Sequence, residues 1–162
     1  MSDYLDDLAK NIREQHRLEA IREEKRVYEK RMKVELDAKR TTFWEQMSDK
    51  LEADIQELRA LLETELQPAN LSIGRNPKGQ LIIKKRAAPT INALVQYEAQ
   101  AGSICVEERR PETGPARGPA DVYKLESDHD LHVFATVGQR VFEDAGELAR
   151  AILQKIFAVQ PA

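Results

Sequence analysis

Residues 4–66 contain neither proline nor glycine and are rich in Glu, Lys, Arg, Leu and Ala, a composition that favours a helix. Within this run, residues 42–66 place large apolar side chains at three- and four-residue steps, with acidic and amide side chains between them. The apolar positions are Trp44, Met47, Leu51, Ile55, Leu58, Leu62 and Leu66. This spacing predicts an amphipathic helix that has to bury one face.

The predicted helical region is too long for the rest of the chain to cover. One unbroken helix over residues 4–66 would be roughly 95 Å long at about 1.5 Å per residue. The remaining residues would form a domain with a radius of gyration of about 12 Å. The helix must therefore project, fold back on itself or pair with another copy.

Thr41 and Thr42 are the place where we expect a break, if the helix has one. Thr42 followed by Glu45 has the form of a capping box, and two adjacent β-branched residues weaken a helix locally. An uninterrupted helix fits the same residues equally well. Both alternatives remain open from the sequence.

Beyond Pro68 the apolar period changes from 3.6 to 2, which is typical of strands. The residues from Asn76 to Gly79 have the composition of a tight turn, and a Pro- and Gly-rich segment over residues 111–120 predicts an exposed loop. We expect about six antiparallel strands over residues 71–137. A helix over residues 143–158, capped by Asp144, should follow them.

These patterns predict an α+β fold, with a charged helical arm over residues 1–41 and an α+β domain over residues 42–162. The C-terminal helix should cover one face of the sheet. The 42–66 helix is the natural cover for the opposite face, because that face also carries apolar residues, so we expect the sheet to pack between or against two helices. The apolar residues of that face are Ile82, Leu94, Tyr123, Leu125 and Phe134.

Charge is unevenly distributed along the predicted helix. Residues 10–40 hold 11 Lys and Arg against 7 Asp and Glu, a net charge of +4, whereas residues 41–66 hold 2 against 7, a net charge of −5. The two segments would attract each other if they lay antiparallel, within one chain or between two chains. With a net charge of −3 for the whole chain, this pattern favours association over general binding of polyanions.

We expect a protein partner or a second copy of the chain, most simply a homodimer, to bind the helical arm. Heptad-like positions in the arm hold apolar residues that could form a coiled-coil seam, although Lys25 and Lys39 interrupt it. The candidate partner-binding residues are Leu18, Ile21, Tyr28, Met32 and Trp44. The sequence thus predicts a non-enzymatic interaction or assembly protein.

A nucleic-acid-binding module is the alternative. Basic residues at two strand ends and in the Pro-rich loop could gather into one rim that contacts phosphates. They are Lys84, Lys85, Arg86, Arg109, Arg110 and Arg117. Against this alternative, acidic residues are interleaved with the same segment, and the aromatic pair that sheet-based RNA binders use for stacking is missing.

No pattern in the sequence predicts a catalytic site, a metal site or a cofactor. Asp128, Asp130 and His132 could face one side of a strand and hold a metal ion, but an acidic hairpin turn with a half-exposed histidine beside it explains them better. The single cysteine, Cys105, has the character of a small core residue and fits a reducing compartment. Because no apolar run approaches 20 residues and the acidic N-terminus is unlike a signal peptide, we expect a cytoplasmic protein that does not enter a membrane.

Overall fold

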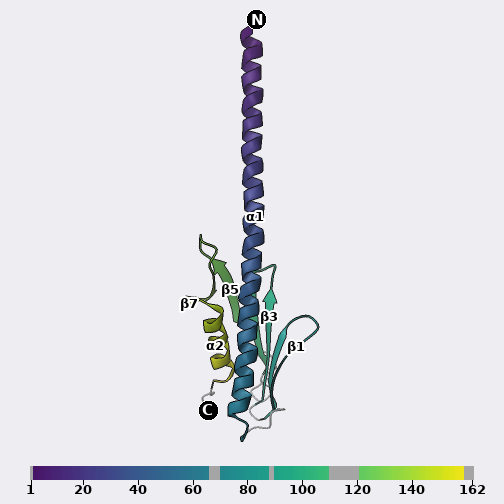
Figure 1. Ribbon diagram of the computed structural model, residues 1–162, viewed down its shortest axis with the longest axis vertical. Helices are drawn as coiled ribbons and strands as arrows, with labels where there is room; N and C mark the ends of the chain where they lie inside the picture. The colour runs from purple at the N-terminus through teal and green to yellow at the C-terminus, as the bar shows by residue number, and fades with distance from the viewer. Residues whose placement is uncertain (1, 66–69, 88–89, 110–120, 159–162) are drawn as a thin grey trace. The chain divides into compact units, whose positions relative to one another are not determined.

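The computed structural model describes residues 2–65, 70–87, 90–109 and 121–158 (Figure 1). The elements follow one another as α1 (Ser2–Leu61), β1 (Leu71–Arg75), β2 (Leu81–Lys85), β3 (Ile91–Glu98), β4 (Ser103–Arg109), β5 (Asp121–Ser127), β6 (Val133–Val137), β7 (Arg140–Phe142) and α2 (Ala145–Ile156). The chain divides into two compact units, Met1–Leu36 and Asp37–Ala162. The predicted α+β class, with a long first helix, an antiparallel sheet and a final helix, is confirmed.

α1 continues without a break through Thr41 and Thr42, so the alternative of an interrupted helix does not hold. The Thr41 hydroxyl donates to the backbone carbonyl of Asp37 at 2.9 Å, and the Thr42 hydroxyl donates to that of Ala38 at 3.0 Å. Both hydroxyls therefore bond inside the helix, one turn back, and neither acts as a cap.

The sheet contains seven strands in the order of the sequence, and every neighbouring pair is antiparallel. About six strands were expected; the additional one is β7, a strand of three residues that pairs with β6. Gly138, with φ of +58°, lies in the turn between these two strands. This conformation is one that glycine adopts readily, which explains how so short a connection closes.

α2 and residues 37–61 of α1 lie side by side on the same face of the sheet (Figure 1). The buried face of α1 includes Met47, Leu51 and Ile55, which are 0% exposed. α2 begins at the N-cap Asp144, whose carboxylate accepts from the Glu147 amide at 2.8 Å. The prediction that the two helices cover opposite faces is therefore wrong.

Tyr123 and Leu125 also lie on the helix-covered face, contrary to the prediction that they share the opposite face with Ile82 and Leu94. Tyr123 pairs with Ile104 across β4 and β5, and Leu125 pairs with Ala135 across β5 and β6. Both side chains are buried. Because directly paired residues point to the same side of a sheet, this register assigns both residues to the helix side.

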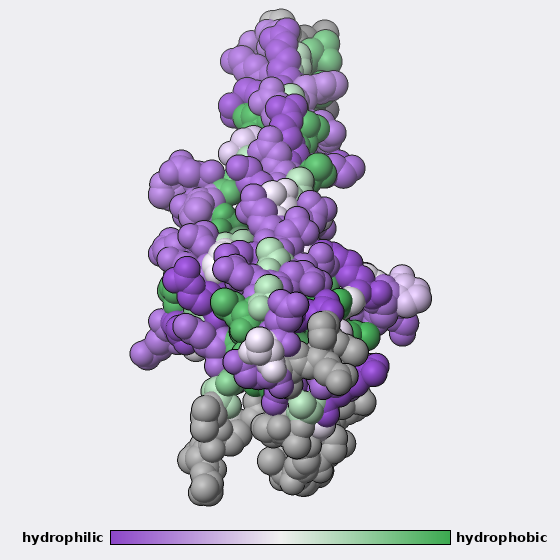
Figure 2. Space-filling view, turned by 60° about the horizontal axis from the view of Figure 1, so that its bottom comes forward, coloured by the Kyte–Doolittle hydropathy of each residue, from purple (hydrophilic) through white to green (hydrophobic). Residues whose placement is uncertain are grey.

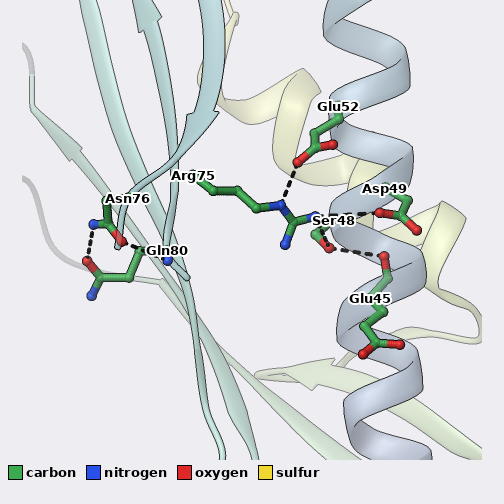
Figure 3. Close-up of polar contacts among 7 residues, drawn as sticks. All are labelled: Glu45, Ser48, Asp49, Glu52, Arg75, Asn76 and Gln80. Atoms are coloured by element: carbon green, nitrogen blue, oxygen red, sulfur yellow. Dashed lines mark hydrogen bonds and ion pairs between the residues drawn. The ribbon is translucent and has the colours of Figure 1, made fainter. Parts of the chain in front are cut away.

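Arg75, the last residue of β1, connects the edge of the sheet to α1 (Figure 3). Its guanidinium donates to Glu52 at 2.7 Å, to the Ser48 hydroxyl at 3.1 Å and to Asp49 at 3.5 Å. Ser48 in turn donates to the backbone carbonyl of Glu45 at 3.0 Å. The contacts satisfy a fully buried hydroxyl and fix the position of α1 along the sheet.

Candidate interaction surface

Residues 2–36 of α1 are called the N-terminal segment below. Exposed apolar side chains are the main feature of this segment. Its large apolar side chains are between 40% exposed, at Leu8, and 70% exposed, at Tyr4. They are Tyr4, Leu5, Leu8, Ile12, Leu18, Ile21, Val27, Tyr28 and Val34. On the face visible in Figure 2, hydrophobic patches alternate with hydrophilic side chains along this segment. Single exposed apolar residues are common on protein surfaces. Nine of them over about 50 Å of helix expose more apolar surface than such isolated residues do.

Four of the five predicted partner-binding residues lie in the N-terminal segment. Leu18 and Ile21 are 43% and 48% exposed, Tyr28 is 62% exposed, and Met32 is partly exposed. Because they recur at heptad-like positions on a continuous helix, the structure keeps them on one side of that helix. They form a stripe that another helix could cover.

Trp44, the fifth predicted partner-binding residue, lies elsewhere. It is 8% exposed and stacks on Tyr97 of β3, with ring centroids 6.0 Å apart and an interplanar angle of 18°. This geometry makes Trp44 part of the core of the second unit. We leave it out of the proposed interface.

Charged side chains on the N-terminal segment form pairs along the helix itself. Glu14 pairs with Arg17, Glu23 with Arg26, and Lys25 with Glu29. The Arg17 guanidinium lowers the pKa of the Glu14 carboxyl. Exposed pairs of this kind stabilise a helix only weakly. Their contribution is smaller than the stabilisation that burying the apolar stripe would give.

The basic residues predicted for nucleic acid do not converge on one face where they are described. Lys84 is exposed on the face of the sheet away from the helices, and Lys85 points to the opposite face because neighbouring residues of a strand alternate. Arg86 is exposed just beyond β2. Arg109 is the final residue of β4, and Arg110 and Arg117 lie outside the described residues. The nucleic-acid interface stays a prediction.

The face of the sheet away from the helices carries a shallow cavity of about 290 Å³. It is lined by Asn76, Gln80, Ile82, Lys84, Asn92, Leu94 and Glu107. Gln80 and Gln96 hydrogen-bond to each other beside it. The lining mixes one cation, one carboxylate, amides and two aliphatic side chains, and this combination indicates no particular ligand.

The acidic turn near the end of the sheet has a structural explanation. One carboxylate oxygen of Asp128 accepts from the backbone amides of Asp130 and His132, each at 2.9 Å, and these bonds lower the pKa of Asp128. The carboxylate thus stabilises the turn before β6. Across the ranges that the structure describes, no three His, Cys, Asp or Glu side chains are grouped so that they could hold a metal ion.

Cys105 lies on β4, buried, as a free thiol. Burial is the largest cause that raises its pKa, and the negative charge of Glu98 adds to it. A raised pKa keeps the sulfur protonated near neutral pH and therefore poorly nucleophilic. Among the described helices, none is long and apolar enough to cross a membrane.

Comparison with protein-family models, curated proteins and solved structures finds no match to this chain. The exposed stripe of the N-terminal segment is the surface of the described residues that best fits an interaction with another protein.

Proposed function

We propose that this protein is a non-enzymatic assembly protein, which self-associates or docks a partner protein through its N-terminal segment. One observation carries the proposal: a continuous helix exposes Leu18, Ile21 and Tyr28 on one side, with Met32 partly exposed beside them. A solvated helix is only marginally stable in water, and burying an apolar side chain contributes about 1.5–3 kcal/mol. Covering the stripe with another helix would therefore stabilise both.

The role of the second unit in this proposal is to anchor the helix. Residues 43–55 of α1 bury a full apolar face against the sheet, so the helix starts from a folded base and does not have to nucleate alone. The coiled-coil form of association follows from the heptad-like spacing. A cytoplasmic location belongs to the proposal, because the one cysteine is a free buried thiol.

The experiment that tests the proposal is sedimentation of the full chain over a range of concentrations, with two double variants. Ile21→Ser with Tyr28→Ser removes apolar surface from the stripe. Val27→Ser with Val34→Ser removes similarly exposed surface from another side of the helix and is the matched control. We expect the first variant to associate at least tenfold more weakly than the wild type and the control to associate nearly as well.

Raising the ionic strength should also weaken association, because the charges that flank the stripe contribute to pairing. A wild-type chain that sediments as an 18.5 kDa monomer at every concentration would remove self-association and leave only docking of a different protein. Equal loss in the two double variants would show that the stripe is not the contact surface.

A further inference from the structure

The order of the charged residues beside the stripe determines whether a second helix would pair more favourably in the parallel or in the antiparallel direction. The heptad-like seam of the N-terminal segment consists of Leu18, Ile21, Lys25, Tyr28, Met32 and Glu35. On a helix, the residues that flank such a seam lie just outside it on either side. One flank holds Arg17, Glu24 and Arg31, and the other holds Arg22, Glu29 and Leu36.

A parallel dimer places like charges together. In a parallel coiled coil a residue of one flank faces the partner's residue five positions further on, from the other flank. Arg17 would face Arg22 of the second copy, and Glu24 would face Glu29. In the seam itself, Lys25 would meet Lys25. The two flank contacts occur on both sides of the dimer, and the Lys25 contact occurs once in the seam. All of these contacts join like charges, so they are repulsive.

An antiparallel dimer centred between Arg26 and Val27 reverses this pattern. In the seam, Met32 meets Ile21 of the second copy, and the aliphatic stem of Lys25 lies against the Tyr28 ring, so that a cation meets an aromatic face. Leu18 meets Glu35 at the two ends of the seam, where the carboxylate can reach solvent. On the flank, Glu24 faces Arg31 of the second copy, and the symmetry repeats the pair.

The next antiparallel register, centred at Lys30, is less favourable. It would bring Lys25 opposite Glu35 in the seam, which is attractive. However, it would also place Arg31 against Arg31 of the second copy, and Glu29 against Glu29. The register centred between residues 26 and 27 is therefore the one in which the flanking charges agree best with the apolar seam.

We propose that the partner of the N-terminal segment is a second copy of the same segment, antiparallel, with its two-fold axis between Arg26 and Val27. This inference rests on the proposed function and adds the identity, direction and register of the partner. The charge complementarity of Glu24 with Arg31 is what selects the second copy as the occupant of the stripe.

Distances between spin labels test the direction. A full-length chain with Cys105→Ser and Arg13→Cys carries one label per protomer on the outer side of the helix. In the antiparallel register, residue 13 of one copy lies at the same height as residue 40 of the other. The two labels are therefore separated by about 27 residues along the helix axis, or roughly 40 Å at about 1.5 Å per residue. A parallel dimer brings them within about 25 Å, since paired helices lie about 8–10 Å apart.

The two possible failures are distinguishable in that experiment. A dimer with the short distance overturns the antiparallel inference and leaves the proposed function intact. A monomer by sedimentation, with no distance between labels, contradicts both the inference and self-association.

A charge reversal tests the register. Glu24→Arg places a second guanidinium against Arg31 in the antiparallel dimer, so we expect roughly tenfold weaker association. In a parallel dimer the same change would face Glu29 and strengthen association. The double variant Glu24→Arg with Arg31→Glu should restore the wild-type affinity, and Glu19→Arg, outside the seam and its flanks, is the matched control. Association unchanged or strengthened by Glu24→Arg would overturn the proposed register.

Discussion

Gly102 is a residue whose small size is required by its surroundings. It has φ of +62°, and a Cβ atom added there would lie 3.0 Å from Cζ of Arg40. Nε of Arg40 donates to the Leu125 carbonyl at 3.1 Å, and the Leu125 amide donates to the Gly102 carbonyl at 2.8 Å. This chain of contacts connects α1 to the turn before β4 and to β5.

Gly102→Ala should lower the free energy of unfolding by about 2–3 kcal/mol, because it adds a steric contact with the Arg40 guanidinium to the cost of a left-handed conformation. Gly79→Ala is the matched control. Gly79 has φ of +78° but no atom within 4 Å of the added Cβ, so only the conformational cost of about 1 kcal/mol applies. Urea denaturation of the two variants measures the difference, and equal losses would contradict it.

Tyr123 predicts a dependence of stability on alkaline pH. Burial is the main cause that raises its pKa from 10.0 to about 12, and the charge of Asp121 adds to it. The unfolded chain therefore releases this proton at lower pH than the folded chain does. The stabilisation from the buried neutral phenol is complete below pH 10 and decreases as the pH rises from 10 through 12.

We expect Tyr123 to contribute about 1 kcal/mol to the loss of stability between about pH 9 and pH 11. Tyr123→Phe removes the titrating group and keeps the ring that contacts Phe142 edge-on at 5.9 Å. Denaturation of both proteins at the two pH values isolates the contribution of this residue. An identical pH dependence in the variant would show that Tyr123 does not titrate as proposed.

At the scale of elements, the buried and the exposed positions of α1 should contribute differently to stability. Residues 43–55 contribute buried side chains to the core of the second unit, whereas Leu61, at the end of the helix, is 73% exposed. Leucine is therefore a buried core residue at Leu51 and an exposed surface residue at Leu61, within the same helix. Burial against the sheet, more than helix propensity, should determine which leucines matter for stability.

Leu51→Ala should lower the free energy of unfolding by about 2–5 kcal/mol, because it leaves a cavity where the side chain was 0% exposed. Leu61→Ala, the same change in the same helix, should cost less than about 0.5 kcal/mol. Thermal or chemical denaturation measures both. Similar losses at the two positions would contradict the packing of α1 on the sheet.

The helix, the first hairpin and the final helix were predictable because each depends on local patterns. The spacing of Met47, Leu51 and Ile55 is helical, and Asp144 has the character of an N-cap. The faces of the sheet were not predictable, because Leu81, Ile82 and Ile83 are all apolar and the alternation in β2 is ambiguous. Which of them faces the helices depends on register between strands, and register is a property of pairs of strands.

The candidate interface was predictable only in part, for a similar reason. Leu18 and Ile21 were identified from heptad spacing, and they are exposed. Trp44 fits the same amphipathic logic, yet it stacks on Tyr97, a residue far away in the sequence. Sequence periodicity shows that a face is apolar; only the folded structure shows whether the chain's own sheet already covers it.

At the scale of the whole molecule, the sheet and the two helices that cover it form the folded core, and we propose that the N-terminal segment serves association. The second unit has a continuous core that extends over the sheet, α2 and residues 43–55 of α1. The N-terminal segment has exposed apolar residues and exposed ion pairs instead. Its helix should therefore become more stable as the concentration of the partner rises above the dissociation constant.

Hydrogen exchange of the full-length protein as a function of its concentration tests this division most directly. We expect backbone amides of residues 2–36 to become more protected as the protein concentration rises from roughly tens of nanomolar to tens of micromolar, because association covers the stripe. Amides of β2 to β5 should be equally protected throughout, since their packing lies within one chain. Protection of residues 2–36 that does not change with concentration would show that this segment does not mediate self-association.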